Sequence, residues 1–233
     1  MAILTVEGLS KIYGSGETAV VAVDDVSFSV EKGEFVAIVG PSGCGKSTLM
    51  NLIGGVDVPT KGRVIIDGKD IYAMNESERA IFRRRNIGMV FQFYNLVPTL
   101  TAEENIMLPY LLDKRRPEQA KLAEILAMVG LTARAKHLPS ALSGGQQQRV
   151  SVGRALINHP ALILADEPTG NLDSQASRDV MALFALANQK FGQTLLLITH
   201  DEKIALMADR ILTLGDGRVR ADEVVKAVCK GGA

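Results

Sequence analysis

The segment Gly40–Thr48, GPSGCGKST, has the residue types and the spacing of a phosphate-binding loop. Its glycines allow backbone N–H groups to converge on phosphate oxygens. Lys46 supplies a cation for the β- and γ-phosphates of a nucleotide, and the Ser47 hydroxyl can be a ligand of Mg²⁺. An apolar strand-like run precedes the segment and a helical pattern follows it, which is the context that this motif requires. The segment therefore predicts a P-loop rather than a glycine-rich turn without a ligand, and Cys44 fills an unconstrained position as a small residue.

A polar side chain or a glycine follows each of the apolar runs FVAIV, IGMVF, LILA and TLLLIT. In chain order these groups are Gly40, Gln92, the pair Asp166 and Glu167, and His200. If the runs form parallel strands, their carboxyl ends meet at one edge of the sheet, where open α/β sheets bind ligands. The pattern therefore predicts one composite site at that edge, next to the P-loop.

The chemistry of these side chains suggests their roles. Asp166 can bind Mg²⁺ directly or through water, and Glu167 can polarise a water molecule for attack on the γ-phosphate. Gln92 can contact the water shell of the metal, and His200 can contact the γ-phosphate or the attacking water. A Gln or His that stands alone at a strand end is more often a structural cap, but beside a P-loop the catalytic interpretation is favoured.

The segment Ala141–Leu156, ALSGGQQQRVSVGRAL, reads as a helix that a serine and two glycines open. The first turn of a helix has free N–H groups and the positive end of the helix dipole, so it suits an anion. The chain thus has a second potential phosphate site, although one nucleotide needs only one P-loop.

The elements that must position these residues follow an α/β pattern. Short runs that are apolar on both faces are typical of parallel strands buried between helices. The predicted strands are Val20–Val30, Phe35–Val39, Arg63–Asp67, Ile87–Phe91, Ala161–Ala165 and Thr194–Ile198, and the predicted helices include Lys46–Ile53 and Ser174–Gln189. The run RILTLGDGRVR predicts a β-hairpin with Asp216 and Gly217 in its turn.

The stretch Asn95–Pro139 lacks strand-like runs and has the period of helices in TAEENIMLPYLL and PEQAKLAEILAMVG. Thr101 and Glu104 have the spacing of a capping box, and Gly130 is placed to end a helix. We therefore expect a helical insert that continues into the helix after Ser143.

Composition and charge favour a globular protein without a nucleic-acid footprint. The chain has 233 residues, of which 47% are hydrophobic and 22% charged, and its formal net charge is zero. The basic clusters 83–85 and 114–116 are expected to be solvated. Cys44 and Cys229 form no metal-ligand or disulfide pattern, which indicates a reducing cytoplasm. The start lacks the features of a signal peptide and no apolar run is long enough to span a bilayer, so we expect any membrane link to run through a partner.

The motif LSGGQ at Leu142–Gln146 lies shortly before LILADE, in one chain with the P-loop, Gln92 and His200. This combination resembles the ATP-binding subunit of ABC transporters over essentially the whole chain. The resemblance implies an α/β fold of the P-loop NTPase type, with a mostly parallel sheet core, an N-terminal antiparallel β region and an inserted helical subdomain. Residues 1–233 would form one ABC-type ATP-binding domain, with the helical subdomain at residues 95–158 inserted in a RecA-like core.

The resemblance also implies a role for each motif residue. Tyr13 would stack on adenine, and Asp173 in NLDS would belong to the D-loop. Gln92 would be the Q-loop residue and His200 the switch histidine. The phosphates would be held by Gly40, Ser42, Gly43, Cys44, Gly45, Lys46, Ser47 and Thr48, and the signature would consist of Ser143, Gly144, Gly145 and Gln146.

The remaining roles implied by the resemblance concern the chemical step. Asp166 would be the Walker B carboxylate and Glu167 the catalytic base. Lys46, Gln92 and His200 would complete the catalytic set. The ligands of Mg²⁺ would be Ser47, Gln92 and Asp166.

Members of this family pair head to tail, which accounts for the second phosphate site. Each ATP would lie between the P-loop of one copy and the signature of the other, with two sites at one two-fold interface. The Ser143 hydroxyl and the N–H groups of the helix start would meet the γ-phosphate, and hydrolysis would let the halves open. We expect a homodimer that binds ATP and Mg²⁺ at its interface, and mainly a monomer without ATP.

An ABC-type ATPase can power a transporter, act as a soluble factor on ribosomes or DNA, or signal without moving a substrate. A single ATPase half, the lack of a heptad insertion and the zero net charge favour transport, with no nucleic acid as partner. FQFYNLVPTLTAEENIMLP and NLDS resemble the subgroup of macrolide exporters, lipoprotein-releasing systems, antimicrobial-peptide resistance pumps and a cell-division regulator. We expect a peripheral protein on the cytoplasmic face of the membrane that drives a permease of this type in export, extraction or mechanotransmission. The transported molecule is not encoded in this chain.

An apolar cluster lies beside Gln92. It could pack in the core of the helical insert, or form a groove for a cytoplasmic helix of the permease. Its members are Phe91, Phe93, Tyr94, Leu96, Val97, Pro98 and Leu100.

Overall fold

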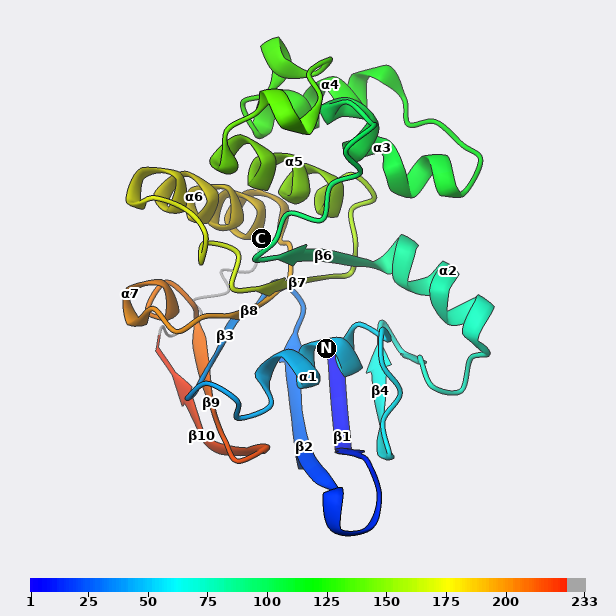
Figure 1. Cartoon of the computed structure of the whole chain (residues 1–233), viewed down its shortest axis with the longest axis vertical. Coiled ribbons are helices and arrows are strands. Elements are labelled where there is room, and N and C mark those ends of the chain that lie inside the picture. Colours follow the sequence, from blue (N-terminus) through cyan, green and yellow to red (C-terminus); the bar gives the residue numbers. More distant parts are fainter. Residues whose placement is uncertain (226–233) are drawn as a thin grey trace.

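The computed structural model describes residues 1–225, and Cys229 lies outside the described residues. It contains two β-sheets and a group of helices above them (Figure 1). The strands are β1 (Ala2–Tyr13), β2 (Val20–Glu31), β3 (Phe35–Val39), β4 (Lys61–Ile66), β5 (Lys69–Asp70), β6 (Ile87–Phe91), β7 (Leu162–Asp166), β8 (Leu195–Ile198), β9 (Arg210–Gly215) and β10 (Arg218–Val224). The helices are α1 (Lys46–Ile53), α2 (Glu76–Asn86), α3 (Ala102–Leu112), α4 (Gln119–Met128), α5 (Gly144–Leu156), α6 (Ser174–Phe191) and α7 (Glu202–Ala205).

The larger sheet has the strand order β10-β9-β3-β8-β7-β6, and its strands from β9 to β6 are parallel. Each inner strand is buried on both faces. In β3, Phe35 and Ala37 join the core on the side of α5 and α6, while Val36 and Ile38 join the core on the side of α1 and the smaller sheet. The continuous apolar runs of the sequence therefore have a physical cause, because side chains alternate between two cores.

The smaller sheet has the order β2-β1-β4-β5 and is antiparallel. This confirms the expected N-terminal antiparallel β region, but β1 itself was not among the predicted strands. Its alternation is interrupted between Val6 and Leu9, where the register with β2 shifts around Gly8. Such a bulge breaks the period of two that identifies a strand in a sequence.

The helices α3, α4 and α5 lie together above the larger sheet, between β6 and β7 in the chain (Figure 1). The capping box of Thr101 and Glu104 is confirmed, and Gly130 follows α4 with a φ of 66°. The helix α2 was not predicted, because only Phe82 of its side chains is buried and no apolar period marks it. Its capping box of Asn75 and Glu78 is the signal that could have identified it.

The other predicted elements are confirmed, with ends that differ by one or two residues. The predicted hairpin is formed by β9 and β10, and its turn residues Asp216 and Gly217 both have positive φ, as a two-residue turn of this kind requires. No helix within residues 1–225 is long and apolar enough to cross a bilayer.

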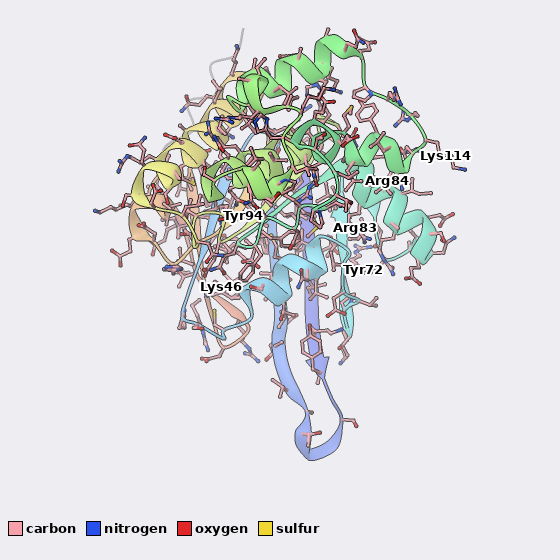
Figure 2. The ribbon with its side chains drawn as sticks, turned by 45° about the horizontal axis from the view of Figure 1, so that its top comes forward. Lys46, Tyr72, Arg83, Arg84, Tyr94 and Lys114 are labelled. Carbon is pink, nitrogen blue, oxygen red and sulfur yellow. The ribbon has the colours of Figure 1, made fainter. Side chains whose placement is uncertain are left out.

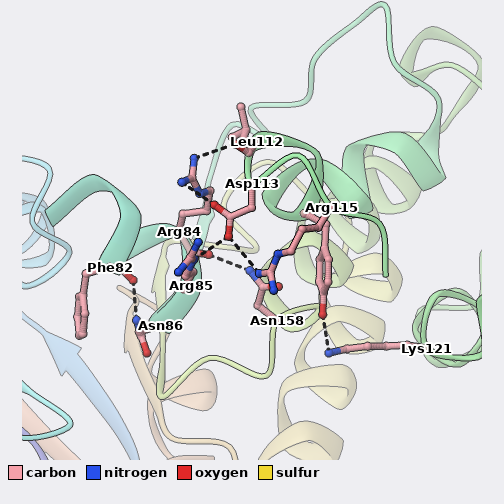
Figure 3. Close-up of polar contacts among 10 residues, drawn as sticks. Phe82, Arg84, Arg85, Asn86, Leu112, Asp113, Arg115, Lys121 and Asn158 are labelled. Carbon is pink, nitrogen blue, oxygen red and sulfur yellow. Dashed lines mark hydrogen bonds and ion pairs between the residues drawn. The ribbon is translucent and has the colours of Figure 1, made fainter. Parts of the chain in front are cut away.

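The two basic clusters are largely solvated, as predicted: residues 85 and 114–116 are exposed, and Arg83 and Arg84 are half-buried. Three of these arginines also share one carboxylate. Arg84, Arg85 and Arg115 form ion pairs with Asp113 at 2.6, 2.7 and 3.1 Å (Figure 3). The Asp113 side chain is 1% exposed. Because Arg84 belongs to α2 and Asp113 ends α3, this cluster ties the strand-rich part of the molecule to the helical part.

Candidate active site

The P-loop lies between β3 and α1 and is packed so closely that glycine is required in it. A Cβ atom at Gly40 would come within 2.2 Å of the Leu214 carbonyl oxygen, and one at Gly45 within 2.1 Å of the Ala22 carbonyl oxygen. Gly45 also has a φ of 99° at the N-terminus of α1. The helix therefore starts directly at the loop and directs its free N–H groups toward it.

Lys46 is 8% exposed, and its Nζ donates to the carbonyl oxygens of Gly40 and Pro41 at 2.9 and 2.8 Å. Figure 2 shows Lys46 at the start of α1. The ammonium group thus lies inside the curve of the loop, held by neutral acceptors. A buried cation with only neutral acceptors is suited to bind phosphate oxygens.

Ser47 and Asp166 meet at the same edge. The hydroxyl of Ser47 lies close enough to the Asp166 carboxylate to act on its charge, as do Lys46 and Glu167. Burial raises the pKa of Asp166, and the nearby Ser47 hydroxyl opposes this shift. A hydroxyl and a carboxylate that is partly desolvated are hard oxygen ligands of the kind that Mg²⁺ takes beside a nucleotide, so the donor set fits this metal.

Glu167 and His200 also meet, across the neighbouring strands β7 and β8. Oε1 of Glu167 lies 3.2 Å from Nδ1 of His200. Glu167 has a φ of 45°, a left-handed conformation that costs roughly 1–2 kcal/mol for a residue with a side chain. Its N–H donates to the carbonyl of Ile198 at 3.0 Å, and its carbonyl accepts from the N–H of Gly170 at 3.0 Å. These two hydrogen bonds hold the strained backbone of Glu167 in place.

Gln92 follows β6 and pairs with Asn171, a residue that the sequence interpretation did not single out. Nε2 of Gln92 donates to Oδ1 of Asn171 at 3.1 Å, and Nδ2 of Asn171 donates to the Gln92 carbonyl at 3.2 Å. A Cβ atom at Gly170 would come within 2.8 Å of Nε2 of Gln92. The position of Asn171 beside the predicted D-loop residue was the available signal.

The parallel register explains why these groups converge. Phe91 of β6, Asp166 of β7 and Ile198 of β8 are aligned with one another, and Ile198 is aligned with Ile38 of β3. The residues after these positions therefore lie along one edge, as the sequence predicted.

The signature segment begins α5. Oγ of Ser143 accepts a hydrogen bond from the Gln146 N–H at 3.3 Å, and Oε1 of Gln146 accepts one from the Ser143 N–H at 3.0 Å. Asp173 caps α6 by accepting from the N–H groups of residues 175 and 176. A cavity of about 340 Å³ opens here and is lined by Ser143, Gly144, Gly145, Asn171 and Asp173, among others. Within the described residues its lining includes no P-loop residue, so the two phosphate sites of one chain are separate.

Tyr13 ends β1 and is 42% exposed. Its hydroxyl donates to Oδ2 of Asp57 at 2.7 Å, and this bond is the main cause that raises the pKa of Tyr13. The hydroxyl also interacts with Thr48, and Nζ of Lys11 lies 4.8 Å from the ring centroid. Tyr13 is thus anchored next to the P-loop, while its role toward adenine stays a prediction.

The sequence profile of the ABC transporter family matches residues 23–170. An uncharacterized ABC transporter ATP-binding protein of Methanocaldococcus jannaschii is 49% identical over 213 residues, covering 90% of this chain and 94% of that protein. The lipoprotein-releasing system ATP-binding protein LolD of Bordetella avium is 43% identical over 94% of this chain and 96% of its own length.

A longer relative is the macrolide export ATP-binding/permease protein MacB of Brucella melitensis, which is 46% identical over 94% of this chain but only 34% of its own length. Among solved structures, a dimeric post-hydrolysis state of the ATP-binding cassette MJ0796 with ADP and Pi matches with a TM-score of 0.88 and 41% identity. That match covers 96% of this chain and 99% of the cassette. The chain therefore belongs to the ABC transporter family and is an ATP-hydrolysing cassette of that family.

Proposed function

We propose that the chain works as a homodimer that hydrolyses ATP to drive a membrane permease of the lipoprotein-release or macrolide-export type. One observation carries this proposal: Ser47, Asp166, Glu167 and His200 converge at one sheet edge, while the signature opens on a separate cavity. A hydrolytic site with its signature elsewhere needs a second copy to complete it. The relatives named LolD and MacB indicate the type of permease.

The chemical step falls to the side chains at the sheet edge. Lys46 would exchange its carbonyl acceptors for the β- and γ-phosphate oxygens, and the N–H groups of the loop would bind the same oxygens. Glu167 would accept a proton from water as the oxygen attacks the γ-phosphorus, the bond from that phosphorus to the β–γ bridging oxygen would break, and ADP and phosphate would leave. His200, in contact with Glu167, would orient the carboxylate. Ser47, Asp166 and Gln92 would hold Mg²⁺, which supplies charge neutralisation on the phosphate oxygens.

The second copy would supply the signature. Ser143 and the N–H groups that start α5 would contact the γ-phosphate bound to the partner P-loop. The dimeric cassette MJ0796, which matches nearly the whole chain, supports this arrangement. Loss of the γ-phosphate would remove a ligand that both copies bind, so the dimer would open.

The permease would dock at a groove between α2, β6, α3 and α5, with a cavity volume of about 490 Å³. The structure divides the predicted apolar cluster: Phe91 lines this groove, Leu96 packs against the core, and Phe93 is 71% exposed. The other apolar lining residues include Met89, Leu108, Pro109 and Leu112.

The charges of the groove indicate the chemistry of its occupant. Arg83, Arg84 and Arg154 line it, and within the described residues no Asp or Glu does. A permease helix with an apolar face and a carboxylate would match both features. Through such a permease the protein would be held at the cytoplasmic face of the membrane, to export or extract a peptide, lipoprotein or drug or to transmit motion across the membrane.

Two measurements test the proposal. Light scattering of the Glu167→Gln variant should show a monomer without nucleotide and a dimer with Mg-ATP. The full chain, expressed together with the permease encoded beside its gene, should copurify with it and show faster ATP hydrolysis. A chain that stays monomeric with Mg-ATP would contradict the proposed homodimer. Copurification with ribosomes or DNA instead of the permease would contradict the proposed role in transport.

A further inference from the structure

The helix α5, which starts at the signature, bonds through two of its side chains to backbone carbonyls on both sides of Gln92. The first is Gln148, which is fully buried. Its Nε2 donates to the carbonyl of Phe91 at 3.1 Å and to the carbonyl of Pro168 at 2.6 Å. Phe91 directly precedes Gln92, and Pro168 directly follows Glu167, so one amide group joins the signature helix to both catalytic turns.

The second side chain is Arg154, near the other end of α5. Nη1 donates to the Asn95 carbonyl at 2.6 Å, and Nη2 donates to the Tyr94 carbonyl at 3.0 Å. A further bond to Oγ of Ser151 fixes the guanidinium on its own helix. The planar fork of an arginine presents separate N–H groups to the two carbonyls in fixed directions, whereas a lysine offers a single ammonium on a flexible stem.

Arg154 carries a charge that the fold does not balance. Burial lowers its pKa, and none of the ion pairs within residues 1–225 involves it. Desolvating a guanidinium without a carboxylate is unfavourable, so a packing role alone would be better served by an uncharged side chain. The carbonyls of the loop after Gln92 are its main compensation.

The loop touches α5 at the signature as well. A Cβ atom at Gly144 would come within 2.7 Å of the hydroxyl of Tyr94, whose carbonyl is held by Arg154. Figure 2 shows Tyr94 beside α5. The loop is shaped for these contacts, because Asn95 has a φ of 48°. Loop and helix are thus fastened from residue 144 to residue 154, along about 15 Å of helix axis.

One hydrogen-bonding group at this junction has no partner within residues 1–225 in this conformation. Oε1 of Gln148 is buried and has no hydrogen-bond partner among the described residues. Native proteins rarely leave such an acceptor unpaired. The junction of loop and helix therefore contains a buried acceptor that this conformation does not satisfy.

We infer that Gln148 and Arg154 are positioning residues that couple the loop of Gln92 to the direction of the signature helix. A change at the γ-phosphate that moves Gln92 would move the carbonyls at 91, 94 and 95, and through them α5. The signature would then meet the nucleotide of the partner only when its own site is loaded. This inference rests on the proposed ATP-bound homodimer and assigns to two residues the transfer of that information within one chain.

The test uses the full chain and separates binding from dimerisation. Arg154→Lys keeps the charge but replaces the rigid guanidinium fork by a single ammonium on a flexible stem, and Arg154→Gln removes the charge. Both variants should bind ATP as monomers with a dissociation constant within about twofold of the unsubstituted chain, since Arg154 does not touch the P-loop. Both should lower kcat at least about tenfold and, in the Glu167→Gln background, raise the ATP concentration needed for dimerisation by a similar factor.

Asn158→Ala is the matched control. Asn158 lies just beyond α5, and its Nδ2 donates to the carbonyl of Arg84 in α2 at 2.9 Å (Figure 3), not to a carbonyl of the loop that follows Gln92. Its removal should leave kcat and dimerisation within twofold of the unsubstituted chain. If Arg154→Gln fails to fold, Gln148→Met, which keeps the volume and removes the donor, should show the same separation of binding from dimerisation.

The inference is overturned if Arg154→Lys keeps normal kcat and dimerisation, or if kcat, dimerisation and monomer ATP affinity all fall together with the melting temperature. The proposed function has a separate criterion. If Glu167→Gln with intact Arg154 and Gln148 stays monomeric with Mg-ATP, then the dimer fails and the coupling inference fails with it.

Discussion

Oε1 of Glu167 lies 3.2 Å from Nδ1 of His200, and each residue comes shortly after the end of its own strand, β7 or β8. The two strands are parallel and in register, so the contact follows from the sheet rather than from a flexible loop. In the proposed reaction the glutamate would accept a proton from water next to the γ-phosphate, and the histidine would orient it.

Glu167→Gln should abolish turnover while leaving nucleotide binding intact. The two side chains have nearly the same shape, but the amide cannot accept the proton of the attacking water. We expect kcat to fall by about 10²–10⁴-fold, the usual contribution of a general base. Steady-state phosphate release measures the loss, and equilibrium binding of labelled ATP is the control. Normal turnover by this variant would assign the base to another residue.

Asp166→Asn should raise thermal stability and abolish Mg²⁺-dependent hydrolysis. Burial raises the pKa of Asp166 above the ordinary value of 3.8, so the folded state binds a proton more readily than the unfolded state. The contribution of this group to stability is therefore fully present in acid and is lost as the pH rises through the folded pKa. At neutral pH the amide should melt on the order of 2 °C higher, and this gain should vanish in acid. A lower melting temperature at neutral pH would contradict the desolvation argument.

Tyr13→Ala should weaken ATP binding about tenfold, since stacking on a base contributes roughly 1–3 kcal/mol. Tyr13→Phe keeps the ring and removes only the hydrogen bond to Asp57, so its affinity should stay close to that of the unsubstituted chain. Fluorescent nucleotide titration measures both variants. Equal losses in the two variants would mean that the hydroxyl and its anchor, rather than the aromatic face, hold the nucleotide.

Leu96→Asp and Phe93→Asp should have opposite effects. Leu96 packs against the core, so a carboxylate there should destabilise the isolated chain by roughly 1–3 kcal/mol. Phe93 is exposed, so its replacement should leave the melting temperature nearly unchanged but weaken copurification with the permease. Calorimetry and affinity copurification distinguish the two results. Unchanged copurification of Phe93→Asp would exclude Phe93 from the surface that binds the permease.

Asp113→Asn should destabilise the chain at neutral pH by on the order of 1 kcal/mol, a modest value because Arg85 and Arg115 are more than half exposed. The hydrogen bond from Arg85 is the main cause that holds the pKa of Asp113 below 3.8. This stabilisation is present above that value and is lost as the pH falls through the folded pKa. Urea unfolding across pH 2–7 should therefore show the two proteins converge in acid. A constant difference at every pH would exclude the charge as its cause.

The sequence alone was sufficient to predict that these polar residues share one edge of the sheet. The runs ending at Gln92, Asp166 and His200 are apolar on both faces, which is possible only for strands covered on both sides, and parallel strands place their carboxyl ends together. The P-loop could also be predicted from the sequence, because its glycines are required by the structure: no Cβ atom fits at Gly40 or Gly45. The strand β1 and the polar helix α2 were missed because neither has a regular spacing of apolar residues in the sequence.

Only the tertiary structure decided which residues support that edge. The sequence placed Glu167 and the signature serine at their turns because the spacing of a motif is local and is set by backbone geometry. It did not bring Asn171 to Gln92, Arg154 to Tyr94, or the two arginines of α2 to Asp113, since those contacts join segments far apart in the chain. Such pairs depend on how the helices pack onto the sheet, and packing is determined by the whole core at once rather than by any one segment.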